Sequence, residues 1–200
     1  MGAGCPPPEL GLASDAPVQA DAILNFWFQE CRPIQWFQAD PGMDSVIRSR
    51  FGTAVQQAID GDCQDWHRGP KTALALVLLL DQFPRHIWRG KAAAYAGDSQ
   101  ALQLSLLAER HGWLQQEEQR ARRQFWLMPR LHSEDLEVQT QALSLFERWT
   151  DPRTHAVALR HREIIRSFGR FPHRNTALKR SSTPAELQHL QQKRSAQSAR

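Results

Sequence analysis

The chain has 200 residues, of which 41% are hydrophobic and 23% charged, and it contains 11 glycines and 12 prolines. These values are close to those of ordinary globular proteins, and they exclude a disordered chain, a collagen-like repeat and a disulfide-rich miniprotein. A chain of this length buries about 70% of the surface that its unfolded form exposes. We therefore expect a single domain with a full hydrophobic core.

The formal net charge of +4 is distributed unevenly along the chain. Residues 1–150 carry 14 basic and 18 acidic side chains, whereas residues 151–200 carry 11 and 3. Arginine supplies 21 of the 25 basic side chains. A basic terminal quarter is one electrostatic signature of nucleic-acid binding. No helix-turn-helix, zinc-finger or base-stacking motif accompanies it, which argues against that function.

The cysteines and the apolar runs indicate the cellular compartment. Cys5, Cys31 and Cys63 are an odd number at wide spacings without a CxxC pair, which is typical of reduced thiols in the cytoplasm. The first 20 residues lack the features of a secretory signal. The longest apolar run, residues 73–80, is too short to span a membrane. The sequence thus predicts a cytoplasmic protein that does not contact a membrane.

Apolar residues recur at helical spacing, and no segment alternates as a half-buried strand does. Helices are predicted in the first half over about residues 15–28, 40–61 and 70–83. Residues 73–80 are apolar on all sides, so the third helix should be central. It should end near Phe83, because Pro84 disfavours helical geometry in the residue before it.

The second half of the chain continues the helical pattern. Helices are predicted over about residues 98–111, 116–127, 133–149, 152–168 and 184–190. Asp98 and Ser133 are expected N-caps, and Pro129 should interrupt the second of these helices. Thr183 and Glu186 have the spacing of a capping box around Pro184.

About eight helices joined by short connections predict an all-α domain whose neighbouring helices are antiparallel. We expect this domain to cover residues 21–190. A flexible leader, residues 1–20, should precede it, and a polar basic tail, residues 191–200, should follow. Lys193 belongs to that expected tail.

Three polar side chains stand on faces that should be buried. Asp81 ends the central apolar helix, Gln139 lies on the apolar stripe of one later helix, and His161 lies on that of another. An unsatisfied buried polar group costs about 2–7 kcal/mol, so these residues should meet polar partners. They form either a structural network that locks helix packing or part of a functional site.

Three connecting segments near these residues are rich in charged and imidazole side chains. Candidate site residues are Asp81, Gln82, Arg85 and Arg89 in the first, His132, Glu134 and Asp135 in the second, and Arg170, His173, Arg174 and Asn175 in the third, with Gln139 and His161 beside them. Loops on a rigid scaffold often carry function. We expect the three segments to converge in one cleft, with Asp81 and His161 largely buried.

The same segments carry a resemblance to a known family. The strings DQFPR at 81–85, HSED at 132–135 and FGRFPHRN at 168–175 resemble a family of bacterial all-helical proteins of unknown function. The similarity runs over about residues 21–190. It implies a tetratricopeptide-like helical array, and it implies no activity.

Two departures from the family pattern are informative. Lys179 occupies a position that is normally glycine. Arg130 adds a cation beside His132, which would shift a pocket there towards more negatively charged ligands.

The arginine-rich segments favour binding of an anionic small molecule or an acidic peptide, because the guanidinium group matches carboxylate and phosphate geometry. An alternative is a hydrolase in which His132 or His161 acts as general base with Glu134 or Asp135. A second alternative is nucleic-acid binding by the basic terminal quarter. No cofactor and no metal are predicted, since metal-binding spacings such as HExxH are absent.

Overall fold

The protein is described here by a computed structural model that covers residues 16–198. Most of the expected leader, including Cys5, lies outside the described residues. Every regular element within the described residues is helical, which confirms the all-α prediction. The α-helices are α1 (Ala16–Asn25), α2 (Pro41–Asp60), α3 (Pro70–Val77), α4 (Phe83–Ile87), α5 (Asp98–Arg110), α6 (Trp113–Gln116), α7 (Arg120–His132), α8 (Leu136–Trp149), α9 (Pro152–Phe168) and α10 (Pro184–Ser198). The tetratricopeptide-like arrangement remains a prediction.

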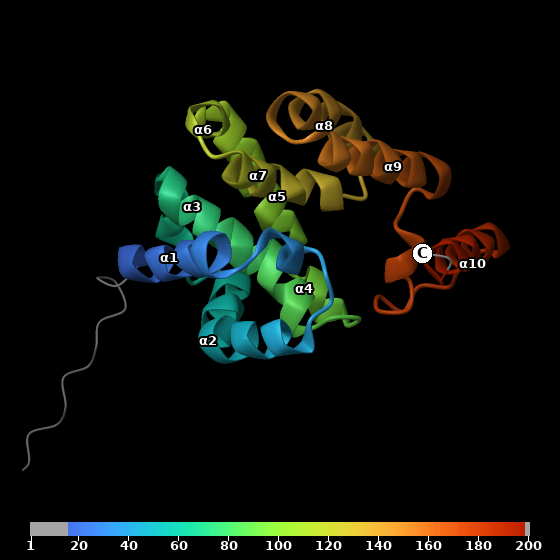
Figure 1. Cartoon of the computed structure of the whole chain (residues 1–200), viewed down its shortest axis with the longest axis horizontal. Coiled ribbons are helices and arrows are strands. Elements are labelled where there is room, and N and C mark those ends of the chain that lie inside the picture. Colours follow the sequence, from blue (N-terminus) through green and yellow to red (C-terminus); the bar gives the residue numbers. More distant parts are fainter. Residues whose placement is uncertain (1–15, 199–200) are drawn as a thin grey trace, which may run out of the picture.

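Shorter helical turns connect these helices. They are the π turns Phe26–Glu30 and Leu78–Gln82 and the 3₁₀ turns Pro33–Trp36, Gln64–Arg68, Ala92–Tyr95 and Pro172–Arg174. Figure 1 shows α8 and α9 side by side in the upper part of the molecule, and α10 at one side beyond the end of α9. No helix within residues 16–198 has the length and apolar character needed to cross a membrane.

Several helix ends form where the sequence predicts them. Asp40 caps α2 by accepting hydrogen bonds from the backbone N–H groups of Gly42 and Met43, and Asp151 caps α9 in the same way. Gly169 follows α9 with a φ of 67°, a conformation that glycine adopts without steric cost. The predicted cap Ser133 is wrong, because Asp135 accepts the hydrogen bonds at the start of α8.

The central helix is continuous through a proline that was expected to end it. Residues 73–80 are all buried, as predicted. After α3, however, the chain passes through the π turn Leu78–Gln82 into α4, and Pro84 lies inside α4. A regular α-helix would press the proline ring against the carbonyl of Leu80. In the π turn the hydrogen-bond register changes, and the Phe83 N–H donates to the Leu78 carbonyl.

Pro129 does not end its helix either. It lies within α7, which begins at Arg120 and reaches His132, while α6 is a separate short helix. Residues 124–131 are all buried, so packing from several sides compensates for the hydrogen bond that the proline cannot make. As a result His132 is the last residue of a helix, where the sequence predicted a loop.

Aromatic side chains from four segments form the centre of the core. The Trp27 ring meets Phe83 at 5.4 Å between ring centroids and Phe125 at 5.4 Å, while Phe51 contacts Phe83 at 5.1 Å. These contacts join the π turn after α1, helix α2, helix α4 and helix α7. Through Trp27, these contacts fix the position of α4 relative to α7. The polar residues Arg85 and His132 lie on these two helices.

Candidate functional site

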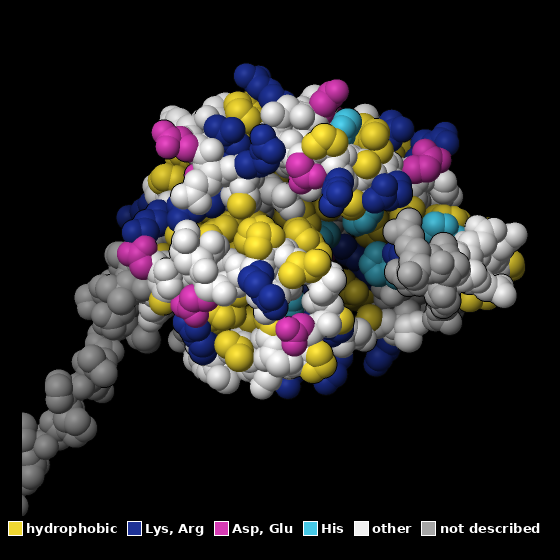
Figure 2. Space-filling view, in the orientation of Figure 1, with side chains coloured by type: hydrophobic (Ala, Val, Ile, Leu, Met, Phe, Trp, Pro, Cys, Tyr) yellow, Lys and Arg dark blue, Asp and Glu magenta, His cyan; other side chains and the backbone are white. Residues whose placement is uncertain are grey.

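A cleft of about 320 Å³ opens where residues after α4, the end of α7, helix α9 and the segment before α10 meet. We call it the cationic cleft. It is lined by Arg85, Arg89, Gly90, Ala94, Tyr95, His132, His161, Phe171, His173, Arg174 and Lys193. Each of the three predicted segments contributes to this lining, so they converge as expected. Figure 2 shows the hollow, with histidine side chains visible inside it.

Among residues 16–198, no carboxylate is part of the lining of the cationic cleft. The nearby acidic residues Asp44, Asp81 and Asp98 contact the lining arginines and histidines instead. Asp81 has no exposed surface at all. The lining therefore consists of cations, imidazoles and neutral residues, and the carboxylates that pair with them lie behind or beside it.

Asp81 and His132 form a hydrogen-bonded pair at the wall of the cleft. The Nδ1 atom of His132 lies 2.7 Å from Oδ1 of Asp81. The carboxylate also accepts a hydrogen bond from the Gln82 amide and pairs with Arg85 at 3.3 Å. Within the described residues no protein group bonds Nε2 of His132. Because Asp81 fixes the proton on Nδ1, Nε2 is an acceptor.

The ionisation of this pair follows from its surroundings. Burial alone would raise the pKa of Asp81, but the charges of Arg85 and His132 outweigh it and lower that pKa to about 2. Burial, with the charge of Arg85, lowers the pKa of His132 despite its carboxylate partner. At neutral pH the site thus contains an ionised Asp81 and a neutral His132.

Asp98 joins the two central arginines. It pairs with Arg85 at 2.9 Å and with Arg174 at 3.1 Å. The sequence assigned Asp98 to capping α5, but it is the first residue of that helix and its side chain makes no capping hydrogen bond. Its carboxylate instead links two cations from segments that are 89 positions apart in the chain.

Arg174 is held on every side. It donates to Asp98 and to the His132 carbonyl at 2.8 Å, and its guanidinium carbon lies 4.7 Å from the ring centroids of both Tyr95 and Phe171. The side chain is buried, and its Nε has no hydrogen-bond partner within the described residues. One donor of this rigid arginine is therefore buried without a partner in this part of the chain.

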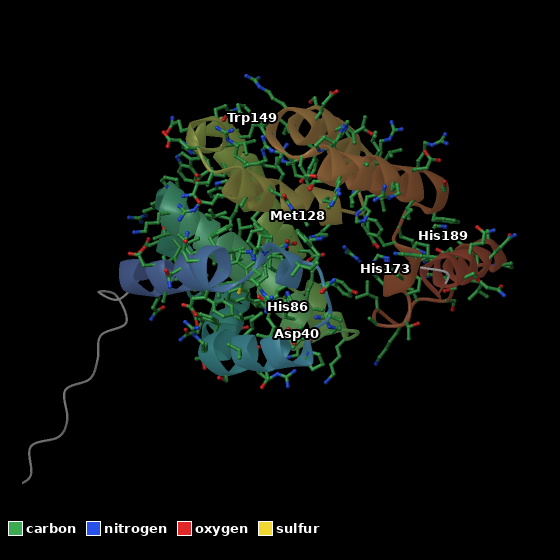
Figure 3. The ribbon with its side chains drawn as sticks, viewed as in Figure 1. Asp40, His86, Met128, Trp149, His173 and His189 are labelled. Carbon is green, nitrogen blue, oxygen red and sulfur yellow. The ribbon has the colours of Figure 1, made fainter. Side chains whose placement is uncertain are left out.

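His161 is half-buried, less than the sequence predicted. Its Nδ1 lies 3.1 Å from the Leu131 carbonyl. Burial lowers the pKa of His161 to about 4, so the ring is neutral near pH 7. His173 also lines the cleft, on the turn between α9 and α10 (Figure 3). Asp81 and His161 thus both belong to the convergent region, the first fully enclosed and the second at the wall.

Glu134 and Asp135 lie outside the cleft lining. Glu134 accepts hydrogen bonds from the Phe171 N–H at 2.8 Å and from the Arg180 guanidinium at 2.7 Å. Asp135 caps α8. Neither carboxylate bonds His132 or His161, so the partner of an imidazole here is Asp81.

Four further predicted site residues make hydrogen bonds outside the cleft lining: Gln82, Gln139, Arg170 and Asn175. Gln139 is buried and donates to the carbonyls of Leu131 and Ser133. Glu186 accepts hydrogen bonds from Arg170, from Asn175 and from the Thr183 N–H. Gln82 donates to Asp81. Arg89 does reach the cleft rim, where it pairs with Asp44 at 2.9 Å.

Sequence reasoning missed Tyr95, Asp98 and Lys193. Lys193 lies on α10, which continues to Ser198, and it lines the cleft although it was expected in a solvated tail. Arg130, expected beside His132 in a pocket, is buried and pairs with Glu109 and Ser105 instead. The sequence shows that Arg130 lies in a predicted helix, but it does not show that Glu109 of another helix is its partner.

The protein is thus all-helical within the described residues, and it has one cleft that is lined mainly by arginine and histidine side chains. The model of a family of bacterial proteins of unknown function, DUF924, matches residues 23–194, and the chain belongs to this family. The chain is 37% identical to a solved protein of unknown function, ATU0120 from Agrobacterium tumefaciens, with a TM-score of 0.82. The match covers 90% of this chain and 99% of that one. No curated protein matches the sequence.

Proposed function

We propose that the cationic cleft binds a small molecule bearing a phosphate or carboxylate group. The observation that supports this most strongly is the composition of the wall. It contains Arg85, Arg89, Arg174, Lys193 and three imidazoles, and no acidic side chain from the described part of the chain. The volume of about 320 Å³ is that of a small-molecule site, which favours a small anion over an acidic peptide.

The rigidity of Arg174 strengthens the proposal. Both terminal nitrogens are committed to Asp98 and the His132 carbonyl, and two rings enclose the guanidinium plane. A ligand would therefore meet a donor that loses little conformational entropy on binding.

Internal pairing of the terminal arginines argues against nucleic-acid binding. Arg170 pairs with Glu186 and Arg180 with Glu134, and neither lines the cleft. These guanidinium groups are not free to neutralise backbone phosphates, which supply most of the affinity in non-specific nucleic-acid complexes. We place the proposed binding in the cytoplasm, in keeping with the free thiols Cys31 and Cys63.

Removal of one cleft cation should weaken binding of inorganic phosphate. Lys193 is exposed, so Lys193→Gln should fold normally and raise the dissociation constant about tenfold, the effect of losing a charge-assisted contact of about 1.4 kcal/mol. Isothermal titration calorimetry at low salt measures this. The matched control is Lys71→Gln, which removes the same charge from a lysine that pairs with Asp21 outside the cleft. Equal affinities of the two variants, or no binding of phosphate and dicarboxylates by the wild type, would contradict the proposal.

A second candidate function is hydrolysis of the bound anion, and the Asp81–His132 pair favours it. The pair orients an imidazole as general-base dyads do. Nε2 of His132 would take a proton from water as the water oxygen attacks the phosphorus of a bound monoester. The ester P–O bond breaks, and the Lys193 ammonium protonates the departing alkoxide. The products are an alcohol and inorganic phosphate.

Turnover of 4-nitrophenyl phosphate should then depend on the protonation of His132. Because burial lowers the pKa of that histidine, the rate should rise with pH below 6.5 and level off near neutrality. His132→Gln should reduce turnover at least about 100-fold and leave the phosphate dissociation constant within a few-fold. Absence of turnover with phosphate and acetate esters would refute hydrolysis and leave the binding proposal untouched.

A further inference from the structure

A second, apolar cavity adjoins the cationic cleft. It has a volume of about 540 Å³ and lies between the segment Pro33–Phe37 and helices α7 and α9. We call it the aromatic groove. Its apolar lining includes Ile34, Trp36, Phe37, Met128, Leu131 and Val157. Figure 3 shows Met128 on α7 towards the middle of the molecule, and Figure 2 shows hydrophobic side chains beside the hollow of the cleft.

The wall of the aromatic groove is fixed by contacts within the protein. Trp36 donates from Nε1 to the Trp27 carbonyl at 2.9 Å and packs edge-on against Phe125 at 5.1 Å. Phe37 stacks on the same Phe125 ring at 6.3 Å. The groove is therefore built into the core and does not depend on a ligand for its shape.

Two large apolar side chains at this groove remain uncovered. Ile34 is 56% exposed and Phe37 is 58% exposed. Exposed apolar groups that gather at a cavity often mark a binding surface. The polar group Asp151 at the edge is already satisfied, because it caps α9 and bonds the Thr154 hydroxyl. The groove therefore offers apolar contacts, and its one carboxylate within the described residues, Asp151, already has hydrogen-bond partners within the protein.

The two cavities share one wall. Leu131 lines the groove and the next residue, His132, lines the cleft. On α9, Val157 lines the groove and His161, one helical turn further, lines the cleft. The contact between the His161 ring and the Leu131 carbonyl joins the two helices at this boundary.

We propose that the ligand is an amphipathic anion, in which a phosphate or carboxylate head lies in the cationic cleft and an alkyl or aryl body lies in the aromatic groove. This inference rests on the proposed anion binding and specifies the class of ligand. The charged wall recognises the head, and the adjoining apolar wall removes the body from water. The occupant is a soluble small molecule and not a membrane surface.

A series of phosphate monoesters tests the proposal. Dissociation constants are measured by calorimetry for inorganic phosphate and for methyl, butyl and hexyl phosphate. Each buried methylene should tighten binding by up to about fourfold, so affinity should rise along the series. If phosphate binds and the alkyl chain adds nothing, the amphipathic ligand is refuted while anion binding stands. If no member binds, the proposed function itself fails.

Groove variants locate the alkyl body. Ile34→Ser should abolish most of the chain-length dependence and leave the affinity for inorganic phosphate unchanged. Leu187→Ser is the matched control, because Leu187 is also 56% exposed and lies outside both cavities. A chain-length dependence that Ile34→Ser and Phe37→Ser both retain would overturn the assignment. Co-sedimentation of the protein with anionic phospholipid vesicles, with no affinity for the soluble esters, would also overturn it.

Discussion

Substitution of Asp81 by alanine is expected to lower the free energy of unfolding by about 3–5 kcal/mol, because it removes a fully buried charge from its partners. Arg85 and His132 would lose the carboxylate that pairs with both. Urea unfolding at pH 7 measures the change. The control is Asp21→Ala, which breaks an exposed ion pair with Lys71 and should cost at most about 1 kcal/mol.

Substitution of Asp81 by asparagine, which removes the charge and keeps the size of the side chain, should show a defined pH dependence. The pKa of Asp81 is about 2 in the folded protein against an ordinary value of 3.8. A carboxyl whose pKa is lowered by folding stabilises the protein fully above its unfolded pKa and loses this contribution as the pH falls through its folded pKa. The stability difference between the wild type and Asp81→Asn should therefore shrink as the pH falls from 3.8 towards 2. A difference that is small at pH 7, or that grows on acidification, would show that the carboxylate does not stabilise the fold.

Alanine at position 97 is expected to destabilise the protein by at least about 2 kcal/mol, through steric overlap. A Cβ atom on Gly97 would lie 2.4 Å from the Leu80 carbonyl oxygen and 2.9 Å from the Leu80 Cα. The backbone φ of −91° suits any residue, so the cost comes from the close approach of two backbones. Relief of the overlap would move Asp98, the next residue, and should also weaken phosphate binding.

Thermal and urea unfolding, together with phosphate calorimetry, would measure both effects of Gly97→Ala. Gly52→Ala is the control, because Gly52 lies inside α2 and its nearest neighbour would be the Arg48 Cγ at 4.0 Å. Alanine there should be neutral or stabilise by about 0.5–1 kcal/mol. Wild-type stability in both variants would mean that the contact between Gly97 and Leu80 is not tightly packed.

Local signals explain why most helix ends could be predicted from the sequence. Asp40 and Asp151 act through backbone groups two and three residues away, and Gly169 through its own φ. The predictions that Pro84 and Pro129 end their helices are wrong, because the local sequence does not show the packing around each proline. Whether a proline ends a helix depends on what surrounds it, and both lie in segments that are buried on several sides.

The cleft could be predicted only in outline. The density of arginine and histidine in three segments indicated which parts of the chain should meet, and residues from all three line the cleft. The partner of each charge was not visible in the sequence. Glu134 and Arg180, for example, are 46 positions apart and pair at 2.7 Å. No local pattern encodes a contact of that kind, because it depends on how α8 and the segment before α10 are placed.

Lys179 has a backbone conformation that is unusual for a residue with a side chain. It has a φ of 54°, in the left-handed region, at a position where the family resemblance led us to expect glycine. The departure noted in the sequence thus coincides with the only positive φ of a non-glycine residue within residues 16–198. A side chain in this conformation carries a small strain that glycine would avoid.

The π turn at Leu78–Gln82 sets the direction in which the charged end of the central helix faces. A π turn accommodates one more residue than a regular helical turn, and each residue rotates an α-helix by about 100°. If the same residues formed a regular α-helix, the segment after Gln82 would be rotated by about 100° relative to α3, and Arg85 and His86 would be turned away from Asp98 and Asp44, the carboxylates they now meet. The hydrogen-bond register of this π turn therefore sets the angular phase between the buried half of the helix and its charged end.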